Sequence, residues 1–129
     1  MSATTLGVRE SPAPPVRIVH MGLGAFHRSH LAWYTARAAD AAEWGIAAYT
    51  GRSAGLANDL TAQDGLYTLV VRSPAGDVAE RIGSIVRAHP GTDVSSFLSD
   101  VAASSTAIVS LTITEAAYAD QALPLDRTL

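Results

Sequence analysis

The sequence predicts an α/β fold built on a parallel sheet, and three observations lead to that prediction. A short apolar run over 16–21 ends in Gly22, and Gly24 follows two residues later, just before a helix-like segment. Strand-like and helix-like segments then alternate, which is typical of βαβ units. A nearly continuous apolar run over 107–113 has the character of a parallel strand covered on both faces. We therefore expect a Rossmann-type parallel sheet, the first part of a dinucleotide-binding domain.

Each predicted element follows from a local pattern. The predicted strands of the parallel sheet, which share short apolar runs, are 16–21, 44–49 and 107–113. The predicted helices are 25–42, 54–62 and a segment that runs from a cap at Thr92 or Asp93 to about 103. Between 65 and 86 the chain has β-branched and aromatic character, with a turn at 74–77 and a break near Gly83. We interpret 65–72 and 78–86 as the two strands of an inserted β-hairpin.

The chain has the length of one domain, and its sequence divides into two parts. Residues 1–15 end in Ser-Pro-Ala-Pro-Pro, which predicts a flexible lead-in. Residues 16–129 supply one half of a dinucleotide-binding fold together with the hairpin, so we expect a truncated domain. The last strand would then leave an apolar edge uncovered. That edge predicts marginal stability of the isolated chain and self-association through it.

Composition excludes several classes of function. The 129 residues carry a net charge of −3 and no block of Lys or Arg, which excludes nucleic acid as the expected partner. The absence of cysteine excludes disulfides, thiolate nucleophiles and cysteine-ligated zinc. The first residues lack the pattern of a secretory signal, and no apolar run reaches the length of a membrane span. We therefore expect a cytoplasmic protein with no membrane partner.

The Gly-x-Gly turn is the first candidate binding site. In the dinucleotide-binding fingerprint one glycine makes the tight turn, a second admits the pyrophosphate and a third allows close packing of helix and strand. Here the first two are present, and a histidine takes the third position. Backbone N–H groups and Arg28 would bind phosphate at this corner; the alternative is an arginine exposed to solvent. The predicted cofactor-binding residues of the turn are Gly22, Leu23, Gly24, Ala25, Phe26, His27 and Arg28.

Three histidines near the turn raise the question of a metal site. His20, His27 and His30 do not have the spacing of a known ligand pattern, and no carboxylate lies near them in the sequence. We therefore interpret them as packing residues and expect no metal.

The end of the second strand bears on the choice between NAD and NADP. An Asp or Glu about 20 residues beyond the glycines usually binds the ribose 2′-hydroxyl of NAD. The segment 49–53 contains no acidic residue, and Arg52 with Ser53 would instead hold a 2′-phosphate, which slightly favours NADP. The alternatives are that Arg52 stacks on the adenine or faces solvent.

Three motifs in order resemble those of a known family. Ile18-Val-His-Met-Gly-Leu-Gly-Ala-Phe-His-Arg-Ser-His30 is similar to the opening of the mannitol dehydrogenase family, the long-chain polyol and uronate dehydrogenases. Segment 62–69 resembles the entry to that family's inserted hairpin, and segment 108–118 resembles its strand ending in Thr-Glu-Lys-Gly-Tyr. Together the motifs cover 16–118 and are far more specific than the glycine turn alone.

The resemblance implies an NAD(P)-dependent oxidoreductase that interconverts a sugar alcohol and a ketose, or a hexonate and a keto-uronate, by hydride transfer. Members are mostly NAD-dependent, so the expected cofactor is NAD or NADP. Family catalysis uses a lysine as general base, with Asn and His partners, from a helical C-terminal domain. This sequence has no lysine, and Ala116-Ala117 replace the family's Lys-Gly. We therefore expect that domain to be absent, the chain to be inactive alone and substrate to bind only with that domain.

The carboxyl end of the last strand is the second candidate site. Open α/β sheets bind ligands at this edge, so Thr112, Thr114 and Glu115 are expected to line the cofactor crevice. The alternative is that Glu115 begins the next helix. Nothing in the sequence places a general base near a substrate, so we predict no catalytic residue. The groups with suitable chemistry are His27, His30, His89 and Tyr118.

Other functions stay open beside this one. The chain is alternatively a stand-alone nucleotide-binding or regulatory module, or the product of a decayed gene, without catalysis. A methyltransferase that uses S-adenosylmethionine has a similar glycine turn, but the inserted Asp64-Gly-Leu-Tyr hairpin argues against it.

Overall fold

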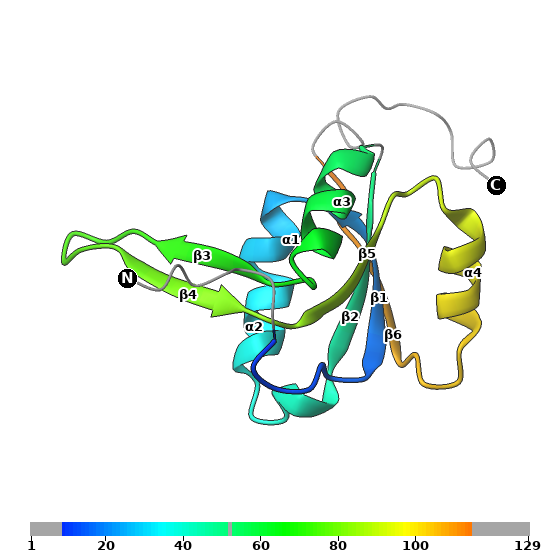
Figure 1. The fold of residues 1–129 in the computed structure, drawn as a ribbon, viewed down its shortest axis with the longest axis horizontal. Helices are drawn as coiled ribbons and strands as arrows, with labels where there is room; N and C mark the ends of the chain where they lie inside the picture. The colour runs from blue at the N-terminus through cyan, green and yellow to red at the C-terminus, as the bar shows by residue number, and fades with distance from the viewer. Residues whose placement is uncertain (1–8, 52, 115–129) are drawn as a thin grey trace, which may run out of the picture.

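A computed structural model describes residues 9–51 and 53–114 as a four-stranded parallel sheet with helices on both faces (Figure 1). The strand order is β5-β2-β1-β6. The strands are β1 (Val16–Leu23), β2 (Gly45–Thr50), β5 (Ile85–His89) and β6 (Ile108–Leu111). The chain adds β2 and β5 on one side of β1 and then crosses to the other side to form β6. The predicted α/β fold with a parallel sheet is confirmed.

Two apolar layers hold the helices against this sheet. On one face, Ile18, Ile46 and Ile85 pack with Leu60 under α1 (Ala25–Ser29), α2 (Leu31–Arg37) and α3 (Ala54–Ala62). On the other face, Val19, Ala47 and Tyr49 pack against α4 (Val94–Ala102) through a phenylalanine. Every residue of β2 is buried, because this strand lies between two other strands and under helices on both sides. No described helix is long and apolar enough to cross a membrane.

The helix predicted over 25–42 is wrong as a single element, because it breaks at His30 and ends at Arg37. The backbone of His30 leaves helical geometry, and the Arg28 carbonyl accepts the Tyr67 hydroxyl, 39 residues further along the chain. The Ser29 hydroxyl donates to the Ala25 carbonyl at 2.9 Å, and Nδ1 of His30 lies 2.9 Å from the Phe26 carbonyl. A separate 3₁₀ turn, Ala41–Glu43, then leads into β2.

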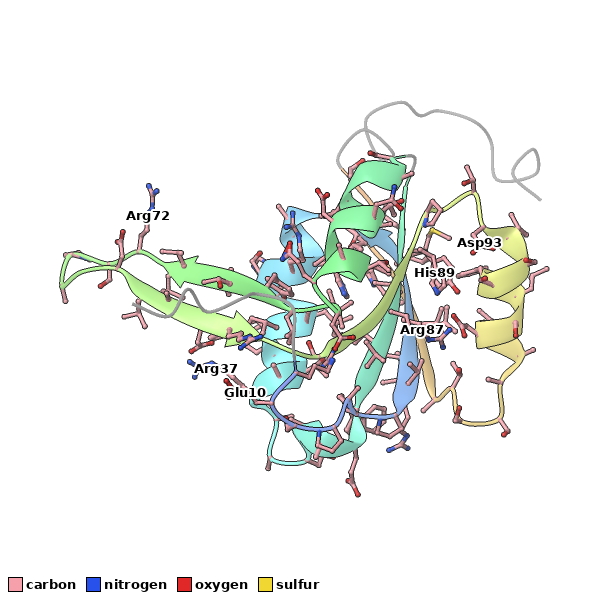
Figure 2. The ribbon with its side chains drawn as sticks, viewed as in Figure 1. Glu10, Arg37, Arg72, Arg87, His89 and Asp93 are labelled. Atoms are coloured by element: carbon pink, nitrogen blue, oxygen red, sulfur yellow. The ribbon has the colours of Figure 1, made fainter. Side chains whose placement is uncertain are left out.

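Helix α4 begins where the sequence predicts it, since the Asp93 carboxylate accepts a hydrogen bond from the Ser96 amide at 3.2 Å. The same helix is fastened to the sheet through the buried carboxylate of Asp100. This group accepts the Tyr49 hydroxyl from β2 and, at 2.8 Å, a guanidinium nitrogen of Arg87 from β5. Figure 2 shows Arg87 in the space between β5 and α4.

The inserted hairpin is confirmed, but its second strand is shorter than predicted. It consists of β3 (Tyr67–Val71) and β4 (Val78–Ile82), paired antiparallel and projecting from the body (Figure 1). The predicted strand over 78–86 is wrong beyond Ile82. The Ser84 carbonyl instead accepts the Ile46 amide at 2.8 Å, so the chain passes through Gly83 into the parallel strand β5.

One charged contact fixes the hairpin on α2. The Glu80 carboxylate accepts the indole N–H of Trp33 at 2.7 Å and pairs with the Arg37 guanidinium. These hydrogen bonds hold the pKa of Glu80 below its ordinary value. Glu80, in the middle of β4, therefore fixes the orientation of the hairpin relative to α2.

Residues 9–15 of the predicted lead-in make hydrogen bonds to the body of the fold. The Arg9 guanidinium donates to the Gly83 carbonyl at 2.8 Å and to the Ile85 carbonyl at 2.7 Å. Further along, the Gly45 amide donates to the Pro15 carbonyl at 2.7 Å. These bonds join the segment to the start of β5 and of β2. Residues 1–8 lie outside the described part of the chain.

Strand β6 differs from the prediction of a strand covered on both faces. Ile108 is 46% exposed, Val109 49% and Leu111 61%, and among the described strands only β1 pairs with it. Within residues 9–51 and 53–114, β6 thus forms an apolar edge that no further strand covers.

Replacement of Gly65 tests how tightly the hairpin joins the sheet. Its φ is +77°, and an added Cβ would lie 2.0 Å from the Ile85 carbonyl oxygen. We expect Gly65→Ala to lower the free energy of unfolding by about 3 kcal/mol, measured by denaturant titration. The matched control is Gly55→Ala in α3, where the nearest contact is 3.5 Å and no positive φ is required. Equal stabilities of the two variants would contradict this description of the junction.

Candidate functional site

The carboxyl ends of β1, β2 and β6 meet at one edge of the sheet. Leu23 of β1 pairs with Thr50 of β2, and Met21 pairs with Leu111 of β6. Because the chain crosses from one side of β1 to the other here, the edge between β1 and β6 is the topological switch point of the sheet. Open α/β sheets bind ligands at such a point.

A cavity of about 460 Å³ lies at this switch point. It is lined by Phe26 from α1 and by the end of β6 and the residues after it: Leu111, Thr112, Ile113 and Thr114. The structure therefore brings together the two threonines predicted from the last strand and the phenylalanine predicted from the glycine turn. The sequence analysis missed Leu111 and Ile113. Nothing in the nearly continuous apolar run over 107–113 distinguishes these two residues from core residues.

The two glycines of the turn have different structural roles. Gly22 has a φ of +104°, and an added Cβ would lie 3.0 Å from the Cβ of Thr112 and 3.1 Å from its carbonyl oxygen. The fold therefore requires a glycine there. Gly24 has extended backbone with a φ of −161°, and an added Cβ would meet nothing closer than 4.0 Å. The described fold does not require a glycine at this position, so the open space beside it suits the close approach of a ligand.

Arg28 lies against the turn. Its Nε donates to the Gly24 carbonyl at 3.2 Å, and its own carbonyl accepts the Tyr67 hydroxyl at 2.5 Å. Within the described residues its terminal guanidinium nitrogens have no hydrogen-bond partner. A cation is thus placed beside the open glycine, as the predicted phosphate contact needs.

His27 occupies the third position of the dinucleotide-binding fingerprint, where a glycine is usual. The whole residue is 1% exposed, and its ring stacks on His20 with centroids 3.7 Å apart, so its side chain points into the core. In the described structure neither ring nitrogen has a hydrogen-bond partner. Burial, with the nearby His20 and Arg28, lowers the pKa of His27 to about 3. The close packing that a third glycine usually allows is replaced here by two flat rings.

The other histidines near the turn also pack. The ring of His30 stacks on Phe26 at 4.1 Å. His20, 3% exposed, lies between one hydroxyl of β6 and one just after that strand: Nδ1 is 2.7 Å from Ser110 Oγ, and Nε2 is 2.9 Å from Thr112 Oγ1. The described residues contain no group of three His, Cys, Asp or Glu that could hold a metal ion.

The remaining predicted site residues fall into three groups. Leu23 is 5% exposed and belongs to the core, whereas Ala25 and Phe26 are exposed at the start of α1. Ser53 is exposed at the carboxyl end of β2 and caps α3, accepting the Gly55 amide at 3.2 Å. Arg52 and Glu115 lie outside the described residues, so their cofactor contacts stay predictions.

These features define a Rossmann-type α/β domain whose candidate ligand site is the glycine turn and the switch-point cavity. The chain belongs to the mannitol dehydrogenase Rossmann domain family, which it matches over residues 16–123. The resemblance inferred from the three sequence motifs is thereby confirmed.

Named relatives support the same assignment. The chain is 39% identical over 117 residues to mannitol 2-dehydrogenase of Aspergillus niger, covering 85% of this chain and 24% of that protein. It is 39% identical over 109 residues to D-mannonate oxidoreductase of Escherichia coli, covering 79% of this chain and 22% of that protein. The chain thus spans less than a quarter of the length of these relatives, and it corresponds to their N-terminal portion.

Because His27 is buried, we expect the free energy of unfolding to decrease as the pH is lowered. In the unfolded chain this imidazole takes up a proton below about pH 6.5, whereas the folded chain resists protonation down to about 3, so acid favours unfolding. Between pH 7 and pH 5 we expect this group to cost about 2 kcal/mol of folding free energy.

The measurement is the difference between the wild type and His27→Phe in denaturant titrations at the two pH values. Carboxylates with lowered pKa values, such as Glu80 and Asp93, affect both proteins alike. A smaller loss in the variant is expected. Parallel losses in the two proteins would show that His27 is not the responsible group.

Proposed function

We propose that this chain is the N-terminal NAD(P)-binding part of a polyol or uronate dehydrogenase. The contrast between Gly22 and Gly24 carries the proposal. The first glycine is explained by the fold, while the second faces open space and is explained by a ligand that approaches the backbone. Family membership and the cavity at the switch point support the same function.

The proposed cofactor lies across the ends of β2, β1 and β6. Its pyrophosphate would contact the backbone of 22–28 and the guanidinium of Arg28, which lies beside Gly24. Arg52 and Ser53 would hold the adenosine ribose at the end of β2. Thr112, which lies against Gly22, would face the pyrophosphate, and Thr114 and Glu115 would line the other end of the site. When bound, the nicotinamide supplies the hydride acceptor or donor, and the chain's own residues orient it.

The proposed reaction is oxidation of a sugar alcohol to a ketose, or of a hexonate to a keto-uronate, by hydride transfer. Mannitol 2-dehydrogenase and D-mannonate oxidoreductase among the relatives have names of this class. The chain has no lysine to serve as the general base that the family resemblance implies. We therefore propose that it binds cofactor but does not turn over substrate without a C-terminal domain.

NADH and NADPH should be compared directly, since the proposal includes both. The segment 49–53 offers no carboxylate for a 2′-hydroxyl, and Ser53 is exposed at the strand end. Tighter binding of NADPH would assign the 2′-phosphate to this loop. Equal or tighter binding of NADH would mean that the loop does not select for the phosphate.

The Gly24→Val variant tests whether a glycine at residue 24 is needed for ligand binding or for folding. Because an added Cβ at residue 24 meets nothing closer than 4.0 Å, we expect the variant to keep the melting temperature of the wild type. A branched side chain would fill the space that the pyrophosphate needs, so NADH affinity should fall about tenfold or more. The readout is NADH fluorescence titration of the 129-residue chain, with the exposed hairpin variant Ala79→Val as the control. Undiminished binding by Gly24→Val would remove the main support for the proposed function.

We also propose that two chains associate through the exposed edge of β6. An unpaired apolar strand edge favours pairing with another strand, and a lysine there opposes it. Val109→Lys should therefore reduce self-association, measured by analytical ultracentrifugation. Val70→Lys on the hairpin is the control, because Val70 is similarly exposed, at 51% against 49%. A wild-type chain that stays monomeric and melts cooperatively would contradict this interface.

A further inference from the structure

We propose that His20 is a positioning residue of the cofactor site. Its Nε2–H holds the Thr112 hydroxyl so that the hydroxyl hydrogen is donated to an oxygen of the bound dinucleotide. This inference rests on the proposed function. It goes beyond it by assigning a role to a buried side chain that does not itself reach the ligand.

The side chain of His20 has no freedom to move. It is 3% exposed, and its two ring nitrogens lie 2.7 Å and 2.9 Å from the hydroxyl oxygens of Ser110 and Thr112. The ring of His27 stacks on one of its faces at 3.7 Å with an interplanar angle of 17°. Since the His27 nitrogens have no partner in the described structure, that ring does not compete for the two hydroxyls.

Thr112 is fixed by its backbone as well as by its side chain. Its amide donates to the Met21 carbonyl at 3.0 Å, and its Cβ approaches to within 3.0 Å of the space where a Cβ on Gly22 would lie. The residue lines the switch-point cavity. A hydroxyl that bonds one imidazole nitrogen, on a residue whose backbone is fixed, is already oriented before a ligand arrives, which reduces the entropy lost on binding.

The number of hydrogens on the ring decides what the hydroxyl can do. Burial lowers the pKa of His20, so the neutral ring carries one N–H. With the hydrogen on Nδ1, the ring donates to Ser110, and Thr112 must donate its own hydrogen to Nε2. With the hydrogen on Nε2, the ring donates to Thr112, whose hydrogen is then available to the cavity. The tautomer of His20 therefore sets whether Thr112 presents an acceptor or a donor.

A dinucleotide selects one of these two states. Its phosphate oxygens only accept hydrogen bonds, so a Thr112 hydroxyl that contacts them must donate. Binding therefore favours the Nε2–H tautomer of His20. The same requirement makes Ser110 the donor to Nδ1, which leaves all three side chains satisfied.

Four variants of the 129-residue chain test this arrangement by NADH titration. Thr112→Val should weaken binding about tenfold or more, whereas Thr112→Ser keeps the hydroxyl and should bind within about threefold of the wild type. His20→Gln places an amide N–H near the position of Nε2 and should preserve most of the affinity. His20→Asn is shorter, reaches only the position of Nδ1 and should lose it. Equal losses in the two His20 variants, with unchanged melting temperatures, would overturn the positioning role.

The tautomer itself gives a readout that does not depend on any variant. ¹⁵N NMR of the imidazole rings, with and without NADH, distinguishes protonated from unprotonated ring nitrogens. We expect the bound state to have hydrogen on Nε2 and none on Nδ1 of His20. A bound state with the hydrogen on Nδ1 would overturn this inference and leave the proposed function standing. Failure of the wild type to bind either NADH or NADPH would overturn both.

Discussion

The close approach of β6 to the glycine turn is the constraint on which the rest of the structure depends. Gly22 has a backbone conformation that other residues rarely adopt, and it lies against Thr112 with no room for a side chain. Because β1 and β6 meet there only through a bare backbone, this residue permits the crossing at the switch point. It also brings the Thr112 hydroxyl to the cavity edge. Fold and candidate site are thus set by one contact.

The sequence predicts those elements whose signals are local. Each of these signals lies within the helix or strand that it specifies, or next to it. They are the apolar runs of β1 and β2, the capping Asp93 of α4 and the segment that forms α3. The errors occur where a distant partner decides. The run over 78–86 has β character with a break near Gly83, and only the pairing of Ser84 with Ile46 shows that it serves two different sheets. At the helix break near His30, the Arg28 carbonyl accepts the hydroxyl of Tyr67, which lies 39 residues further along the chain.

The sequence predicts where the candidate site lies, but it does not predict which side chains contact one another within it. The spacing of Gly22 and Gly24 predicts the turn, but it does not show which glycine the fold requires and which one has open space beside it. That distinction comes from the atoms of β6, about 90 residues away along the chain. The partners of His20 are 90 and 92 residues distant, so no local pattern indicates them. A buried histidine pair in place of a third glycine follows only from tertiary packing.

The attachment of Arg9 has a practical consequence for handling the protein. Its guanidinium holds the carbonyls of Gly83 and Ile85, and Pro15 bonds the first residue of β2, so the chain enters the fold at the amino ends of the strands. The open glycine and the cavity are at the opposite edge of the sheet. A purification tag, a fluorophore or a sensor-chip linker joined ahead of Arg9 therefore connects to the side remote from the ligand. Immobilisation through that end keeps the attachment point away from the candidate site in surface measurements.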